Sequence, residues 1–241
     1  MQVSIKGLEI KEMVDIKNEF VKEIAHQFNV INIDTTRLEI NKGEIDYKLV
    51  VQLDTTILEF RNEDNTDTIY IFNTPEMQII RFSESILFDE GKFSLKGRGR
   101  LILKRFGKVL KSKINQIRRI QIEGHTDFIP YNRLIKIEKP CDIFEFCDYK
   151  LEDTIHASNI HLGALRAIEV YKFLIDTVGI DPFKTLISVV SFGKYKPVNR
   201  SENIAFTPQM LDLANADESL RRANRRVEIV LIYKLSEGRK R

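Results

Sequence analysis

The chain has 241 residues, of which 43% are hydrophobic and 30% are charged, a balance typical of a soluble globular protein. Its formal net charge is only +3, and its basic residues are spread along the chain apart from the run 239–241, so charge gives no support for nucleic-acid binding. No segment has the roughly 18 apolar residues that a membrane helix needs, and no apolar run follows Met1 as in a signal peptide. Read literally, this predicts a cytoplasmic protein. However, the chain enters a helical pattern abruptly, which equally fits a fragment of a membrane-anchored protein.

Residues 1–75 are expected to form an extension or linker that contains one helix and several strands. Apolar residues recur at helical spacing over residues 10–28, which predicts an amphipathic helix. Residues 37–72 alternate short β-rich runs with polar turn clusters, which predicts hairpins. Pro75 marks the expected boundary.

A regular alternation of strands and helices follows over residues 76–235, and residues 236–241 form a tail. The predicted elements are a strand at 79–88, a helix at 95–109, a strand at 118–123, a helix at 158–177, a strand at 186–192, a partly helical segment and a strand at 227–233. Gly179 is expected to cap the second helix. This order predicts an α/β (α+β) sandwich in which helices cover one side of a mixed sheet.

Residues 128–156 interrupt this alternation. Pro130, Pro140 and mixed charge predict a long loop or insertion there. Cys141 and Cys147 lie within it and could close a disulfide loop in an oxidising compartment, although two unpaired thiols are an equally good interpretation.

The helix over residues 158–177 and the strand before the insertion are predicted to place opposite charges in one cleft. Asn159 and Arg166 lie two helical turns apart and about 20° from each other in projection, on the flank of the apolar stripe that should face the sheet. That stripe comprises Ile160, Ala164, Ala167, Tyr171, Leu174 and Val178. Asp127 lies just beyond its strand. Such a pair suits a zwitterionic amino acid, since Asp accepts from an ammonium and Arg offers a planar fork to a carboxylate.

Several segments together resemble the C-terminal domain of the OmpA family. Residues 122–127 (IEGHTD), 159–167 (NIHLGALRA) and 224–229 (NRRVEI) are similar to that family's signature segments, and residues 188–197 resemble its third strand and turn. The family includes the peptidoglycan-associated lipoprotein and the flagellar stator subunit MotB. The resemblance covers roughly residues 79–233, in the family's order.

This resemblance implies binding of the diaminopimelate residue in the stem peptide of peptidoglycan. By motif position, Asp127 would bind the ligand's ammonium and Arg166 its carboxylate. The other pocket residues that the resemblance implies are Asn159, Arg225, Thr126, Leu162 and the backbone around Gly91. Strand alternation should place Arg225 and Arg226 on opposite faces, and family position favours Arg225 for the pocket.

The chain departs from the family pattern at two places. Gly163 stands where the family usually has Ser, and we expect the lost hydroxyl to weaken local capping or packing more than ligand binding. The segment between Asp127 and Asn159 is much longer than usual. It could cover the pocket, narrow its specificity or abolish it.

No cofactor or metal is expected, and no enzymatic activity. The candidate metal ligands match no established zinc spacing; they are His125, Asp127, Cys141, Cys147, His156 and His161. The chain also lacks a catalytic Ser/His/Asp signature, a phosphate-binding glycine loop and a metalloprotease helix motif.

Two functions remain open. The first is a cell-wall anchor of an envelope or MotB-like motor complex in the periplasm, which would imply a homodimer and a MotA-like membrane channel subunit as partner; such relatives include subunits of anti-phage defence motors. The second is a protein-interaction module on the same scaffold, with the wall-binding pocket unused. A mutual salt bridge between Asp127 and Arg166 would favour the second.

Overall fold

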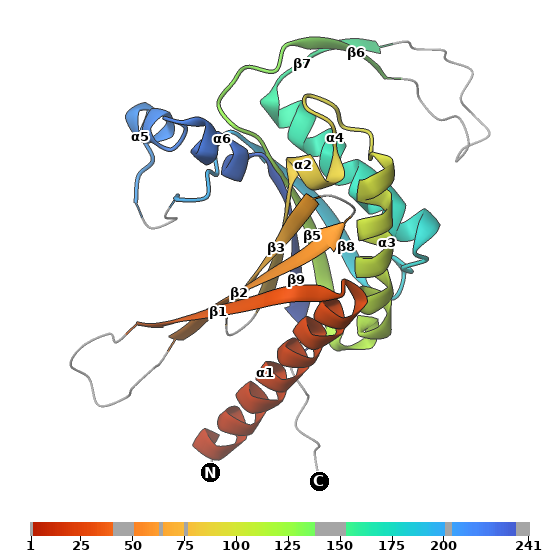
Figure 1. Ribbon diagram of the computed structural model, residues 1–241, viewed down its shortest axis with the longest axis vertical. Helices are drawn as coiled ribbons and strands as arrows, with labels where there is room; N and C mark the ends of the chain where they lie inside the picture. Colours follow the sequence, from red (N-terminus) through yellow and green to blue (C-terminus); the bar gives the residue numbers. More distant parts are fainter. Residues whose placement is uncertain are drawn as a thin grey trace.

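The computed structural model describes residues 2–40, 51–62, 65–74, 77–137, 153–200 and 204–234. Figure 1 shows its helices and strands in space. In chain order they are α1 (Gln2–Gln27), β1 (Val30–Ile40), β2 (Val51–Asn62), β3 (Asn65–Asn73), β4 (Met77–Ser83), α2 (Glu84–Leu87), α3 (Gly97–Ser112), η1 (Ile114–Gln116), β5 (Ile117–His125), β6 (Arg133–Ile137), β7 (Asp153–Ala157), α4 (Asn159–Lys172), η2 (Phe173–Thr177), β8 (Leu186–Gly193), α5 (Pro208–Leu213), α6 (Glu218–Asn224) and β9 (Arg226–Tyr233).

A seven-stranded sheet runs through the molecule in the order β1-β2-β3-β4-β9-β5-β8. Strands β5 and β8 are parallel, and the other neighbours are antiparallel. Helices α1, α3 and α4 lie together on one side of this sheet (Figure 1). The predicted mixed sheet with helices on one side is therefore confirmed.

The hydrophobic core lies between these helices and the sheet. Alternate residues of the central strands point into it, including Phe82 of β4, Ile120 and Ile122 of β5, and Ile229 of β9, all fully buried. Phe106 of α3 packs edge-on against Phe82 at 5.4 Å between ring centroids. Ile120 and Ile122, two residues apart in β5, therefore face the same way.

The N-terminal extension joins the same sheet and core. Strand β3 pairs with β4, and Phe20 of α1 lies edge-on to Phe106 at 6.1 Å. Lys113 forms ion pairs with Glu19 and Glu23 of α1 at 3.0 and 2.9 Å. The division at Pro75 stays a prediction, and Pro75 itself lies outside the described residues. Across the parts of the chain that are described, no helix is both long and apolar enough to cross a bilayer.

Several predicted elements have different bounds. Helix α1 begins at Gln2 rather than near residue 10, and the strand predicted over 79–88 ends at Ser83, where α2 begins. Helix α3 begins at Gly97, because Lys96 before it has an extended backbone. Strand β8 is half-buried because it lies at the edge of the sheet.

The insertion is not simply a loop. Its two ends, β6 and β7, pair as antiparallel strands, so backbone hydrogen bonds close its base. Cys141 and Cys147 lie outside the described residues, and the disulfide stays a prediction.

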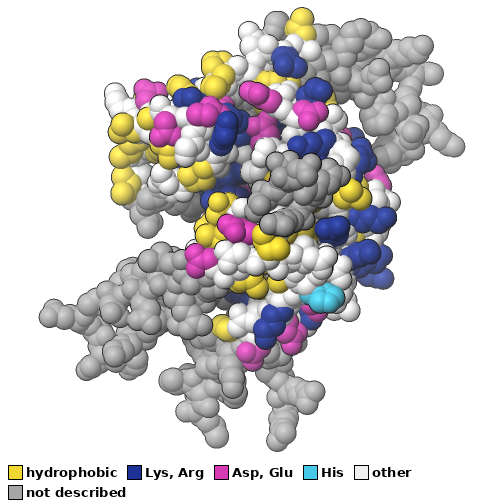
Figure 2. All heavy atoms as spheres, in the orientation of Figure 1, with side chains coloured by type: hydrophobic (Ala, Val, Ile, Leu, Met, Phe, Trp, Pro, Cys, Tyr) yellow, Lys and Arg dark blue, Asp and Glu magenta, His cyan; other side chains and the backbone are white. Residues whose placement is uncertain are grey.

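Helix α3 carries a row of basic side chains on its outer surface. Its 16 residues include no acidic residue, and Arg100, Lys104, Lys108 and Lys111 are all exposed at intervals of about one turn. Figure 2 shows Lys and Arg side chains gathered at the right-hand edge, where α3 lies in Figure 1. The expectation of evenly spread basic residues is therefore wrong for this helix.

Candidate functional site

Two glycines bring α4 directly against β5. A Cβ atom added to Gly124 would lie 1.9 Å from the carbonyl oxygen of Gly163, and one added to Gly163 would lie 2.4 Å from Oγ of Ser191. That hydroxyl donates a hydrogen bond to the carbonyl of Ile160 at 2.7 Å. The expectation that Gly163 loosens local packing is wrong, because its missing side chain allows backbone contact between helix and strand.

The buried face of α4 differs from the predicted apolar stripe. Arg166 is only 1% exposed, whereas Ile160 is 40% exposed. Leu174 and Ala167 face the core as predicted. The predicted stripe is therefore wrong at Ile160, and Arg166 lies on the buried face rather than on its flank.

All seven residues predicted for the pocket line one cavity of about 110 Å³. They are Asp127, Arg166, Asn159, Arg225, Thr126, Leu162 and Gly91. The structure adds Glu84, Glu90 and the start of the insertion at residues 129–131. Residues from β5, α4 and the segment before β9, far apart in sequence, therefore meet at one site.

Asn159 holds the start of the insertion in place. Its amide nitrogen donates to the carbonyls of Asp127 at 2.8 Å and Ile129 at 3.0 Å. Its side-chain oxygen accepts from the amide of Tyr131 at 2.6 Å. Both amide N–H groups are therefore committed to the loop, so Asn159 shapes the pocket and has no spare donor for a ligand.

Thr126, Leu162 and Gly91 shape the remaining wall. The amide of Thr126 donates to the carbonyl of Gly193 at 2.9 Å, which fixes the chain as it leaves β5. Leu162 contributes a nearly buried apolar side chain. Gly91 has a φ of +64°, a left-handed conformation that favours glycine.

Arg166 is held by an acidic residue that sequence reasoning missed. Its Nη2 atom forms an ion pair with Glu84, and its Nε donates to the carbonyl of Lys92 at 3.0 Å. Burial lowers the pKa of Arg166, and Glu84 opposes that shift. Glu84 lies in α2, and no motif or spacing in the sequence marks it.

Arg225 connects three carboxylates. Its nitrogens lie 2.6 Å from Asp127, 2.9 Å from Glu84 and 2.7 Å from Glu218. Burial alone lowers the pKa of Arg225, but hydrogen bonds with Glu218 and Asp127 raise it above its ordinary value. Hydrogen bonds from Arg225 and then Arg221 lower the pKa of Glu218 to about 2.

The charges at the pocket therefore alternate along a chain of contacts. Arg166 contacts Glu84, Glu84 contacts Arg225, and Arg225 contacts Asp127. Among the ion pairs of the described residues, Asp127 and Arg166 are bound to these two partners and not to each other. The salt bridge between Asp127 and Arg166 that would favour an unused pocket is therefore not among these ion pairs.

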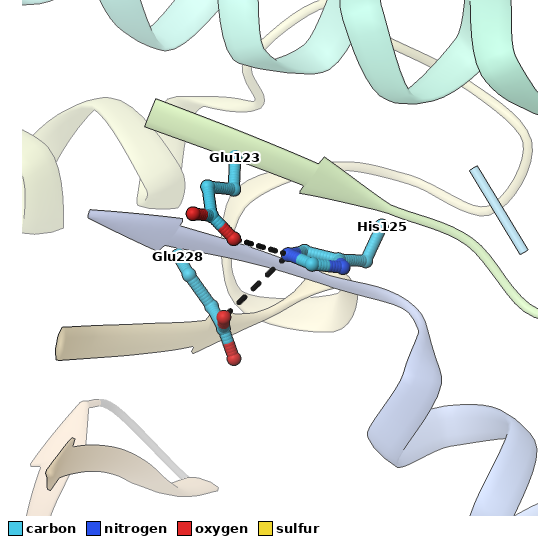
Figure 3. Close-up of side chains that lie close together, drawn as sticks. All are labelled: Glu123, His125 and Glu228. Atoms are coloured by element: carbon cyan, nitrogen blue, oxygen red, sulfur yellow. Dashed lines mark ion pairs between the residues drawn. The ribbon is translucent and has the colours of Figure 1, made fainter. Parts of the chain in front are cut away.

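A second charged cluster lies on the sheet, with Glu123, His125 and Glu228 side by side (Figure 3). Nε2 of His125 lies 3.3 Å from Glu123 and 3.5 Å from Glu228. Burial lowers the pKa of His125. Burial by itself would raise the pKa of Glu228, but the charges of nearby Arg226 and Arg81 outweigh it and lower that pKa to about 2.

Cations already neutralise these two carboxylates. Arg226 and Arg81 lie 2.8 and 2.7 Å from Glu228, and Lys196 lies 3.1 Å from Glu123. A metal cation would have to compete with all three positive charges. His125 thus belongs to a structural ion network, and Arg226 faces away from Arg225 as strand alternation predicted.

His161, another residue considered for metal binding, caps α4. The amide of Ser158 donates to Nδ1 of His161 at 3.0 Å, completing a capping box at the helix N-terminus. His161 therefore stabilises the helix that carries Arg166.

Comparisons with known proteins give one family match. The sequence profile of the OmpA family matches residues 87–209. None of the curated proteins matches the chain.

The chain is also similar to several solved structures. The periplasmic domain of MotB from Helicobacter pylori is 20% identical over 74% of this chain and 90% of that one, with a TM-score of 0.48. The cell wall anchor of the T6SS from Pseudomonas aeruginosa is 20% identical over 69% and 88%, with a TM-score of 0.45. The peptidoglycan-associated lipoprotein from Burkholderia pseudomallei is 23% identical over 62% and 88%, with a TM-score of 0.36. Because the profile match spans just over half of its residues, the chain belongs to the OmpA family.

Proposed function

We propose that this protein binds peptidoglycan non-covalently and anchors an envelope complex, such as a MotB-like stator, to the cell wall in the periplasm. The observation that carries this proposal is the single cavity onto which Asp127 and Arg166 both open. Its position within a member of the OmpA family supports the cell wall as the ligand. The protein acts as a binding protein rather than an enzyme.

The ligand group is the free amino-acid end of a stem peptide, with diaminopimelate as the specific residue. Asp127 accepts hydrogen bonds from the ammonium, and Arg166 donates to the carboxylate. A cavity of about 110 Å³ accommodates the head of one amino acid and leaves the rest of the peptide outside. Leu162 and the backbone at Gly91 form the wall against its aliphatic part.

Wall anchoring of this kind needs a second attachment outside the pocket. A homodimer and a MotA-like channel subunit are the partners that fit a motor role, and the row of contacts between α1 and α3 fixes the N-terminal helix to the wall-binding domain. A force applied to α1 is thereby transmitted to the pocket through packed elements.

A pull-down with purified peptidoglycan tests the proposal. We expect the wild type to bind, and Asp127→Ala or Arg166→Ala to reduce binding at least tenfold, because a hydrogen bond to a charged group contributes about 1.5–3 kcal/mol. Asp127→Asn and Arg166→Lys keep size or charge and should also bind more weakly, since they lose the ammonium's counter-charge and the planar fork.

Matched controls are Asp176→Ala and Arg118→Ala, which remove the same charges at exposed positions. These two variants should bind like the wild type, and thermal melts should show that every variant is folded. Equal binding by all folded variants would remove the pocket assignment. In that case the alternative, a protein-interaction module with an unused wall-binding pocket, would account better for charges that are already paired within the chain.

A further inference from the structure

We propose that Glu84 and Arg225 form an internal substitute for the ligand, so that a zwitterion binds by exchange with the chain's own ion pair. The carboxylate of Glu84 contacts Arg166, and the guanidinium of Arg225 contacts Asp127. These are the two groups that would receive the ligand's carboxylate and ammonium. The inference rests on the proposed function and concerns how the same site is controlled.

The internal pair has the charge arrangement of a zwitterion. Nε of Arg225 lies 2.9 Å from Glu84, so one negative and one positive group are held together, as they are in an amino acid. Each of them also contacts the pocket group of opposite sign. Asp127 and Arg166 are only 5% and 1% exposed, and the chain itself provides their counter-charges, which avoids the large penalty of an unpaired buried charge.

Arg225 lines a second cavity and already contacts a carboxylate there. A second cavity of about 390 Å³ shares Glu84, Glu90 and Arg225 with the ligand pocket as lining residues. Glu218 lines that larger cavity and already lies 2.7 Å from Nη2 of Arg225. When a ligand's ammonium takes Asp127, the guanidinium can give up its contact with Asp127 and turn further toward Glu218, which then becomes its main partner.

Exchange makes the affinity depend on how readily Arg225 leaves Asp127. The apparent dissociation constant rises as the fraction of molecules with an accessible Asp127 falls. Glu218 competes with Asp127 for Arg225 and therefore favours the accessible state. Removing Arg225 and removing Glu218 should consequently shift ligand affinity in opposite directions.

Isothermal titration with a soluble muramyl tripeptide that ends in meso-diaminopimelate tests this inference. We expect Arg225→Gln to bind at least about threefold more tightly than the wild type and Glu218→Gln at least about threefold more weakly, as the accessible fraction rises and falls. Arg118→Gln is the matched control, because it removes an exposed arginine at the opposite end of β5, and it should bind like the wild type.

The possible results separate this inference from the proposed function. No binding by the wild type would overturn both. Binding by the wild type together with weaker or unchanged binding by Arg225→Gln would overturn exchange alone, since Arg225 would then be an ordinary ligand contact or a bystander. If a thermal melt shows that Arg225→Gln does not fold, Glu218→Gln provides the test, because the side chain of Glu218 is on the surface. Unchanged or tighter binding by Glu218→Gln would overturn the exchange.

Discussion

Two charged clusters lie near β5 and β9 but differ in their surroundings. The pocket cluster comprises Asp127, Arg225, Glu84 and Arg166, and the sheet-face cluster comprises Glu123, His125, Glu228 and Arg226. Arg225 and Asp127 belong to the pocket cluster. Their near neighbours in sequence, Arg226 and His125, belong to the sheet-face cluster. On the sheet face, the side chain of Arg226 is 2% exposed and its partner Glu228 is 4% exposed. At the pocket, Arg225 is 16% exposed and lines two cavities.

This difference shows how similar ion pairs can have different roles. Ions enclosed by packed side chains cannot exchange a protein partner for water or a ligand, so they hold the strands in one arrangement. Ions beside a cavity can exchange a protein partner for a ligand or water at little net loss of contacts. Strand alternation, which directs successive side chains to opposite faces, separates Arg225 from Arg226. Asp127 lies beyond the end of β5, so alternation does not set its direction relative to His125.

The largest expected effect comes from removing one arginine from each cluster. Arg226→Met should destabilise the fold by about 3–5 kcal/mol, because it breaks a buried ion pair, leaves Arg81 as the remaining arginine partner of Glu228, and removes two hydrogen bonds from the guanidinium to backbone carbonyls. Arg225→Met should destabilise it by only about 1.5–3 kcal/mol, since water in the cavity can hydrate Asp127. Urea unfolding followed by circular dichroism measures both. Equal losses would show that the two clusters do not differ in the way proposed.

The pocket residues were predictable because they belong to local motifs. Asp127 follows a short strand with an alternating pattern, and Arg166 lies within a helix whose flanking residues identify the family. The opposite directions of Arg225 and Arg226 followed from strand alternation alone. These features depend on neighbours in sequence, so one sequence contains enough information to find them.

Glu84 was missed because its role depends on contacts across the whole chain. It lies 82 residues from Arg166 and is brought there by sheet order, which the sequence pattern did not determine. The burial of Arg166 was missed for a related reason. Only the contact between Gly124 and Gly163 shows how closely α4 approaches the sheet, and a helical wheel contains no such distance.

The next effect concerns the contact that positions only the pocket cluster. Gly124→Ala should destabilise the protein by about 1–3 kcal/mol, because its Cβ would overlap the backbone of Gly163 and force α4 away from β5. Arg166 would move with the helix, so peptidoglycan binding should also fall. Unfolding and pull-down measurements on the same preparation test both parts.

Gly97→Ala is the matched control for this substitution, since nothing lies within 4 Å of a Cβ atom at that position. It should leave stability and wall binding close to those of the wild type. If Gly124→Ala behaves in the same way, the close helix–strand contact does not determine the geometry of the pocket.

The smallest expected effect is a pH dependence that belongs to the sheet-face cluster alone. Burial lowers the pKa of His125 below its ordinary value of 6.5. The close contact with Glu123 and the charge of Glu228 only partly oppose this shift, while the charge of Arg226 adds to it. As pH falls below about 6.5, the unfolded chain therefore takes up a proton that the folded protein does not, and stability decreases by at most about 1.4 kcal/mol per pH unit.

This pH window isolates His125 from the acidic groups of both clusters. The lowered pKa values of Glu228 and Glu218, each about 2, weaken the fold only as pH drops below the ordinary carboxylate value of 4.5. Between pH 7 and 5, His125→Gln should flatten the decrease in unfolding free energy, whereas the exposed His26→Gln should not. An unchanged slope in His125→Gln would mean that the imidazole can be protonated within its ion network, and that this cluster, like the pocket, tolerates a change of charge.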